Sequence, residues 1–249
     1  DVAPSRGLGD VYKRQDLKDG QAVRLFKGDY NQKTVYSDHP EELAQTFEKA
    51  GAIYLHVVDL DGAKDGFAKN LETIKKIRNS TKMKIELGGG IRDLKTVQLY
   101  LDEVGIDRVI LGTAALKDPK FLKEVLRQYG SEKIVVGVDV KNGFVSTAGW
   151  LETSQMPYIE FIQYLEAIGV GYIVATDISK DGTLTGPNFE MYDEIAKNSQ
   201  IQFVVSGGIK DFDNIQKVAQ KDYYACIVGK AYYEKKIDLK ETIKCLQNV

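Results

Sequence analysis

The chain alternates between short apolar runs and amphipathic segments. Apolar runs of strand length stand at 52–60, 83–87, 108–112, 133–140, 171–178, 201–207 and 224–229. Continuous apolar runs, without a polar residue at every second position, are typical of parallel strands that are buried on both faces. The segments between them are patterned as helices with one apolar face. We therefore expect a series of strand–helix units.

Several of the expected helices carry recognisable boundaries. In "HPEELAQTFEKAG" and "DPKFLKEVLRQYG", proline takes the first helical position, and Gly51 or Gly130 provides the stop signal. Asp93 and Asp211 follow glycine-rich turns and are predicted to cap the next helices. No linker rich in Pro, Gly or Ser divides the chain, which favours a single domain.

The chain also resembles itself. "ELGGGIRDLKTVQ" matches "VSGGIKDFDNIQ" when Gly89 is set over Gly207, and the predicted strand ends repeat in the same order. "DLKDG" corresponds to "DVKNG", "VDL" to "TDI", and "GTA" to "GKA". We expect a (β/α)8 TIM barrel made of two duplicated (β/α)4 halves, at about 16–130 and 131–249. A doubly wound open sheet is the alternative, but it predicts no such repeat.

Composition narrows the possible partners. The chain has 249 residues, a formal net charge of −2 and an isoelectric point of about 5.9, so it has no basic excess for nucleic acid or a membrane surface. No apolar run approaches the roughly 18 residues of a membrane span. The two histidines and two cysteines lack the spacing of metal ligands. We expect a soluble, cytoplasmic, monomeric protein without a metal.

Glycine-rich strand ends predict anion sites at the mouth of the barrel. Loops after the last two strands of such barrels often bind phosphate, because glycine lets backbone N–H groups approach an anion closely. Here those loops contain Ser206, Gly207, Gly208, Gly229 and Lys230. The loops on the opposite side contain Gly88, Gly89, Gly90, Gly112 and Thr113. Two facing sites suit a substrate with a phosphate at each end. The alternative is that these glycines only form tight turns.

Two carboxylates share this symmetry. Asp16 and Asp139 end the first and fifth strands, between the two anion sites, where one could remove a proton while the other donates one. The alternative is that each caps the turn after it. Further candidates for substrate contact, each with an ordinary structural alternative, are Thr176, Arg24, Arg92, Asp181 and the single tryptophan, Trp150.

From about Asp16 to the C-terminus, the chain resembles the histidine-biosynthesis isomerases that act on phosphoribosyl-formimino-aminoimidazole-carboxamide ribotide (ProFAR). The resemblance rests on "DLKDGQAVRLFKGD", "HVVDLDGAKDG", "ELGGGIR", "LGTAAL", "ATDISKDGTLTGPN", "SGGI" and "VGKA". It implies a half-barrel duplication and an Amadori rearrangement of a bisphosphate, ProFAR to PRFAR, with no cofactor or metal. It also implies Asp16 as general base, Asp139 as general acid and Thr176 as an assisting group.

Two other functions stay open. The cyclase subunit of imidazole glycerol phosphate synthase resembles this family in its duplicated barrel and its two strand-end aspartates. "VGKAYYE", "AVRLFKGD" and Trp150 in "AGW" resemble the isomerase instead. The third possibility is a barrel that binds a bisphosphate without turning it over.

The start of the chain motivates that third possibility. Residues 1–15, "DVAPSRGLGDVYKRQ", are polar where the family has an apolar first strand. Period-two alternation places Arg14 on the face of Asp16, inside the barrel, where an unpaired charge costs several kcal/mol. We expect residues 1–15 to be foreign to the rest of the chain, and to replace or distort the first strand.

Overall fold

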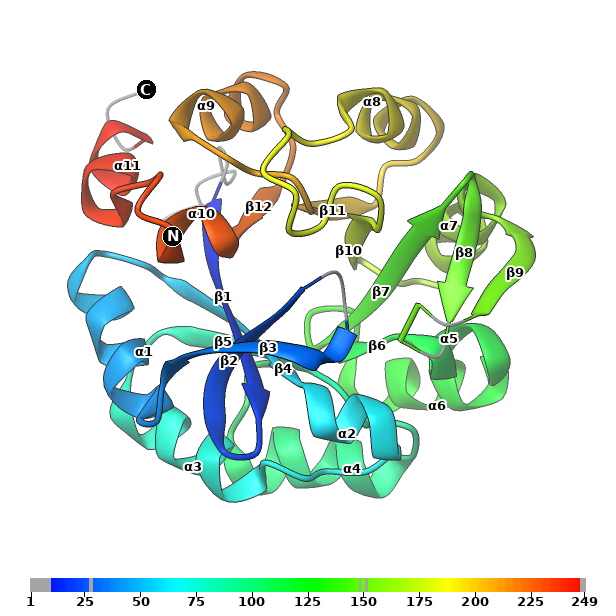
Figure 1. Cartoon of the computed structure of the whole chain (residues 1–249). Coiled ribbons are helices and arrows are strands. Elements are labelled where there is room, and N and C mark those ends of the chain that lie inside the picture. Colours follow the sequence, from blue (N-terminus) through cyan, green and yellow to red (C-terminus); the bar gives the residue numbers. More distant parts are fainter. Residues whose placement is uncertain (1–9, 27–28, 148, 151, 247–249) are drawn as a thin grey trace, which may run out of the picture.

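The computed structural model describes residues 10–26, 29–147, 149–150 and 152–246. Parallel strands form a closed ring in the order β10, β11, β12, β1, β4, β5, β6, β7, and β7 pairs with β10 to close it. The predicted (β/α)8 barrel is confirmed (Figure 1). The ring strands are β1 (Asp10–Lys18), β4 (Tyr54–Asp59), β5 (Lys84–Gly88), β6 (Arg108–Leu111), β7 (Ile134–Lys141), β10 (Tyr172–Asp177), β11 (Gln202–Ser206) and β12 (Ala225–Val228).

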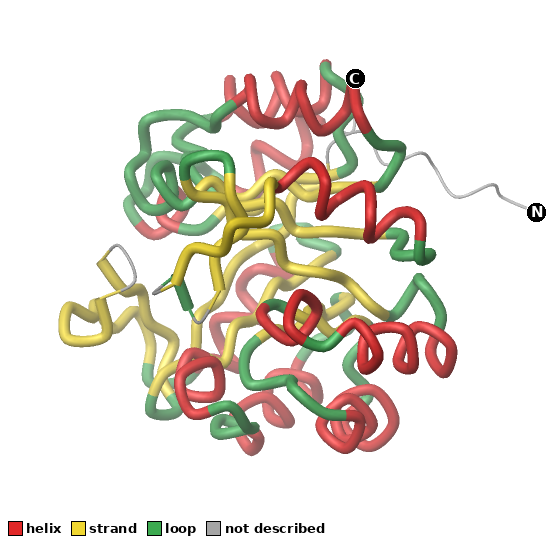
Figure 2. The backbone as a smooth tube through the Cα atoms, turned by 90° about the vertical axis from the view of Figure 1, so that its right-hand side faces the viewer, coloured by secondary structure: helices red, strands yellow, loops and turns green. Residues whose placement is uncertain are grey.

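Helices surround the ring, as Figure 2 shows from the side. One stretch is a π-helix, η1, which continues α4. The helices are α1 (Pro40–Lys49), α2 (Leu60–Asp65), α3 (Leu71–Ser80), α4 (Leu94–Gln98), η1 (Leu99–Val104), α5 (Thr113–Lys117), α6 (Pro119–Tyr129), α7 (Tyr158–Ala167), α8 (Phe189–Asn198), α9 (Phe212–Gln220), α10 (Lys230–Tyr233) and α11 (Leu239–Leu246).

The predicted helix boundaries are confirmed. Helices α1 and α6 begin at Pro40 and Pro119, and Gly130 is the C-cap of α6. Asp93 accepts a hydrogen bond from the backbone N–H of Thr96 at 2.8 Å and so caps α4. Asp211 caps α9 in the same way. Each cap fixes the point at which a helix leaves a glycine-rich turn at the barrel mouth.

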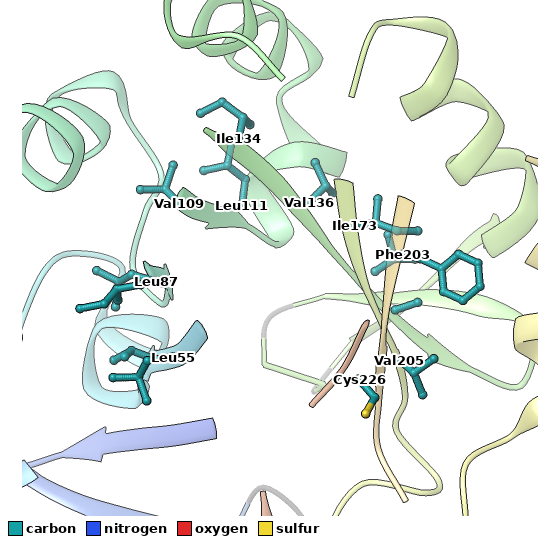
Figure 3. Packing of buried hydrophobic residues seen from close by; sticks show 14 of the residues in the cluster. Leu55, Leu87, Val109, Leu111, Ile134, Val136, Ile173, Phe203, Val205 and Cys226 are labelled. Atoms are coloured by element: carbon teal, nitrogen blue, oxygen red, sulfur yellow. The ribbon is translucent and has the colours of Figure 1, made fainter. Parts of the chain in front are cut away.

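The core has two layers. The larger lies between the strands and the helices, and Figure 3 shows part of it, including Leu55, Leu87 and Val136. The smaller fills the barrel interior with residues such as Ile110 and Val174. Together they fill the space on both faces of the ring strands.

Residues 10–15 form part of the first strand, and the expectation that residues 1–15 are foreign to the rest of the chain stays a prediction. Residues 10–15 do not distort the strand: β1 pairs in parallel register with β12 on one side and with β4 on the other. The charged side chains of Lys13 and Arg14 have partners inside the fold. Arg14 is ion-paired with Asp16, and Nζ of Lys13 donates to the carbonyl of Val228 at 3.1 Å and lies 4.1 Å from the ring centre of Tyr233. The remaining part of the segment, residues 1–9, lies outside the described residues.

Two hairpins that we did not predict extend the barrel mouth. Strands β2 (Gln21–Phe26) and β3 (Asp29–Ser37) follow β1, and β8 (Phe144–Thr147) and β9 (Glu152–Pro157) follow β7. Both pairs are antiparallel and continue from the carboxyl ends of ring strands. They therefore stand over the end of the barrel where the candidate residues lie.

Candidate active site

A cavity of about 230 Å³ opens at the carboxyl ends of the ring strands. A smaller pocket adjoins it, and Arg24, Asp181 and Ser206 line both. Every site residue predicted from the sequence lines one of the two. The cavity has Asp16, Gly88, Gly89, Gly90, Arg92, Gly112, Thr113, Asp139, Trp150 and Thr176. The smaller pocket has Gly207, Gly208, Gly229 and Lys230.

The glycine turns after β5 and β11 have nearly the same backbone. Gly89 has φ 105° and Gly207 has φ 98°. A Cβ on Gly89 would lie 2.1 Å from the backbone oxygen of Asp59, and one on Gly207 would lie 3.0 Å from that of Asp177. Real Cβ atoms do not approach a backbone oxygen as closely as 2.1 Å. No residue other than glycine therefore fits at position 89, in the turn after β5, without moving the neighbouring loop.

Two other strand-end carboxylates have structural partners. Asp59, at the end of β4, accepts hydrogen bonds from the backbone N–H groups of Gly62 and Asn70. Asp177, at the end of β10, accepts from the side chains of Ser179 and Asn188. They hold the loops that follow them, which distinguishes them from the carboxylates that face the cavity.

Asp16 is buried and held by two arginines. Arg14 donates from Nε to one oxygen at 2.7 Å, and Arg24 donates from Nη1 to the other at 3.2 Å. Burial alone would raise the pKa of Asp16, but the two guanidinium groups outweigh it and hold that pKa below its usual range. Asp16 is therefore an anion, as a general base must be before it accepts a proton.

Asp139 lies in a different environment. Its carboxylate accepts a hydrogen bond from the indole N–H of Trp150 at 2.9 Å. Burial raises the pKa of Asp139, and hydrogen bonds from Trp150 and Thr176 only partly offset it. The carboxyl group therefore keeps its proton to higher pH than Asp16 does, as a general acid must.

Arg24 links Asp16 to the loop that contains Asp181. It donates from Nη2 to both oxygens of Asp181, at 2.8 and 2.9 Å, besides its bond to Asp16. Lys230 donates to the carbonyl of Gly182, beside Asp181. On the other side of the mouth, Arg92 donates to the carbonyl of Ala63. Each of these cations also supports a loop.

The cavity includes residues that we did not select as site residues from the sequence. Tyr30 lines it from β3, and its hydroxyl donates to the carbonyl of Leu60. His56 lines it from β4 and pairs with the buried Glu86 at 2.6 Å. Tyr30 stands directly after the motif "KGD", a signal that could have found it. The partner of His56 could not be found from the sequence, because no local pattern joins β4 to β5.

Within the described ranges, no three His, Cys, Asp or Glu side chains gather as a metal site would require. In the same part of the chain, no helix has the length and apolar character needed to cross a bilayer.

The fold is a (β/α)8 barrel, and its mouth brings two carboxylates and several glycine-rich loops to one cavity. Over residues 11–238, the sequence matches the family described as histidine biosynthesis protein. The chain belongs to that family.

Several curated relatives share most of the chain. A protein of Lactococcus lactis subsp. cremoris (strain SK11) is 61% identical over 226 residues, which are 91% of this chain and 92% of the relative. Relatives from Campylobacter hominis (52% identical over 227 residues; 91% and 94% covered) and Bacillus cytotoxicus (47% identical over 229 residues; 92% and 95% covered) are also similar. Each is named 1-(5-phosphoribosyl)-5-((5-phosphoribosylamino)methylideneamino) imidazole-4-carboxamide isomerase, the ProFAR isomerase.

Proposed function

We propose that the chain catalyses the Amadori rearrangement of ProFAR, an aminoaldose, to the aminoketose PRFAR in histidine biosynthesis. The names of its relatives support this activity. The observation that carries the mechanism is the pair of carboxyl groups, Asp16 and Asp139, which line one cavity and have pKa values shifted in opposite directions. An enzyme that moves a proton between neighbouring carbons needs such a pair.

Protonated Asp139 donates its proton to the ribose ring oxygen. The ring carbon–oxygen bond then breaks, and a Schiff base forms at the first sugar carbon. Asp16 takes a proton from the second carbon, and the electron pair neutralises the iminium nitrogen to give an enolamine. Tautomerisation of the enolamine yields the ketose, so atoms and electrons balance without a co-reactant. Thr176 assists beside Asp139, with which it forms a hydrogen bond.

The substrate would be positioned by its two phosphates. Gly88, Gly89 and Gly90 with Gly112 and Thr113 offer one anion site, and the loops from Ser206 and from Gly229 offer the other. Trp150 presents an indole ring at the cavity, which suits the planar imidazole-carboxamide between the phosphates.

Turnover of ProFAR by the purified chain tests the proposal. General acid–base groups contribute about 10²–10⁴-fold, so Asp16→Asn and Asp139→Asn should each lower kcat by a factor in that range. Asp213→Asn is the matched control, because this carboxylate is exposed on α9 and lies outside both pockets. Absence of turnover in the parent chain, or full activity in either cavity variant, would contradict the assignment.

A further inference from the structure

A buried histidine and a buried glutamate form a pair that the proposed mechanism does not use. His56 and Glu86 are register partners on β4 and β5, and Nδ1 of His56 lies 2.6 Å from Oε1 of Glu86. Only 5% of His56 and 1% of Glu86 is exposed. Taking such a pair out of water carries a desolvation cost. Packing alone does not account for it, as the other half of the barrel shows.

Two valines occupy the equivalent positions in the other half of the barrel. The sequence repeat that aligns the two glycine turns sets His56 over Val174. It also sets Glu86 over Val204. Val174 and Val204 are register partners on β10 and β11, and both belong to the apolar cluster inside the barrel. An apolar pair thus fills the same place in the same fold, so closing the barrel does not require the histidine and the glutamate.

His56 faces the cavity close to Asp16. It lies beside Arg14 of β1, and the next residue of β4 on the same face, Val58, lies beside Asp16. Both His56 and Asp16 line the cavity. Burial raises the pKa of Asp16, the two arginines lower it, and a charged His56 lowers it further. The imidazole is therefore a close neighbour of the carboxylate that acts as base in the proposed mechanism.

The pair determines which ring nitrogen is available to a ligand. Glu86 in its ionised form accepts a hydrogen bond from Nδ1, so Nε2 of the neutral imidazole keeps its lone pair. Nε2 forms no hydrogen bond with any residue that the structure describes. A carboxylate behind an imidazole orients the ring and stabilises the imidazolium that forms when the ring takes a proton. His56 is thus arranged as a general base.

The proposed rearrangement contains a proton that neither aspartate takes. Asp139 protonates the ring oxygen, and Asp16 removes the carbon-bound proton of the second sugar carbon. The hydroxyl group on that carbon must also lose its proton before the carbon becomes a ketone. A third group in the cavity is therefore needed to accept it.

We propose that His56 is a third proton-transfer residue of the cavity, which takes this hydroxyl proton, and that Glu86 positions it. The inference rests on the proposed function. In this step the oxygen–hydrogen bond breaks, Nε2 gains the proton, and the bonding pair becomes the carbon–oxygen double bond. The enolamine double-bond pair takes the proton that Asp16 holds, at the first carbon. Asp16 is again an anion, the imidazolium gives its proton to water, and water resupplies Asp139.

Turnover of ProFAR in D₂O, followed by proton NMR on the full chain, tests the role of His56. His56→Asn can still donate to Glu86 but is no base, so kcat should fall by about 10²–10⁴-fold. Asp16 still removes its proton in this variant. The ProFAR that remains should therefore exchange hydrogen for deuterium at the second carbon at close to the parent's rate. His39→Asn is the matched control, because the other histidine is exposed and lies outside both pockets.

Glu86 should act only through His56. Glu86→Gln keeps an acceptor for Nδ1 without the charge, so kcat should fall by a smaller factor than in His56→Asn. The double variant His56→Asn/Glu86→Gln should be no slower than His56→Asn alone, since residues that act as a unit are not additive. Losses that multiply would overturn the positioning role of Glu86.

A second double variant separates catalysis from folding. His56→Val/Glu86→Val copies the valine pair of the other half, and replacing a buried ionic pair by apolar residues is often neutral or stabilising. Its melting temperature should equal or exceed that of the parent, while its kcat falls as in His56→Asn. Thermal melting of every variant shows that the loss of kcat is not a loss of fold.

The outcomes distinguish this inference from the proposed function. Full kcat in His56→Asn, or deuterium exchange that falls as far as turnover does, would overturn the role of His56 and leave the isomerase standing. Asp16→Asn should lose both exchange and turnover. A parent chain with neither turnover nor exchange would overturn the proposed function and this inference together.

Discussion

Asp16 and Asp139 are the same residue type at corresponding strand ends, yet their environments make them chemically different. Two guanidinium groups hold the pKa of Asp16 down, and burial raises the pKa of Asp139. Activity on the proposed pathway needs Asp16 ionised and Asp139 protonated. The rate should therefore fall as pH drops through the pKa of Asp16, and fall again as pH rises through that of Asp139.

Replacing Trp150 should shift only the alkaline limb of the pH–rate profile. The indole hydrogen bond favours the ionised form of Asp139, so Trp150→Phe should raise the pKa of Asp139 further. We expect the alkaline limb of kcat/KM against pH to move to higher pH, while the acid limb, to which Asp139 does not contribute, stays in place. An alkaline limb that stays fixed or moves to lower pH would contradict this assignment.

For single residues, the sequence predicted which side chains lie together at the barrel mouth. It did not predict which of them form hydrogen bonds or ion pairs with one another. Asp16, Asp139 and Thr176 could be found because strand ends of a parallel barrel lie together. The bond from Arg24 to Asp181 joins positions far apart in the chain, and no periodic pattern reports it. We expected Arg14 inside the barrel as a destabilising charge. Only the structure shows that Arg14 forms an ion pair with Asp16.

At the scale of single elements, the most specific prediction about stability concerns the glycine turn after β5. Gly89→Ala would place a Cβ 2.1 Å from a backbone oxygen, at φ 105°. Gly105→Ala is a matched control, since Gly105 has φ 78° and no neighbour within 4 Å of an added Cβ. The control should lose about 1–2 kcal/mol from the left-handed conformation alone.

Gly89→Ala should lose at least about 1–3 kcal/mol more, because the turn or β4 must shift to relieve the overlap. Urea unfolding of both variants gives the two free energies of unfolding. Equal losses would show that the close approach to Asp59 does not constrain this turn.

Elements with strong local signals were predictable, and elements without them were not. Proline, aspartate caps and glycine stops marked α1, α4, α6 and α9 correctly. Strand β9, "ETSQMP", has no apolar run, and it forms because β8 offers it an antiparallel partner. Strand β1 carries Lys13 and Gln15, yet two neighbouring strands fix its backbone. Pairing across the sheet overrides weak propensity in both cases.

For the whole molecule, the closed ring followed from counting strand–helix units, while the duplication of two halves stays a prediction from the sequence. The predicted monomer can be checked by light scattering coupled to gel filtration. One chain supplies the glycine-rich loops and both carboxylates that line the two pockets. The exposed large apolar side chains that the structure describes are few and lie on separate elements or loops, at Val35, Ile53, Phe67, Phe144 and Met156.

We therefore expect the scattering mass to equal that of one chain, 27.8 kDa, at all concentrations tested. A mass near twice that value, persisting on dilution, would show that a dimer interface exists.

Because the ring of parallel strands is closed, the strand edges that lack a neighbour lie on the hairpins outside it. Every ring strand has a neighbour on both sides, whereas β3 pairs only with β2 and β9 only with β8 in the described part of the sheet. Each of these two outer strands has one edge whose backbone N–H and C=O groups could pair with a strand of another molecule. Both belong to the hairpins over the mouth. Any assembly of this chain by strand addition would therefore begin at the entrance through which a ligand must pass.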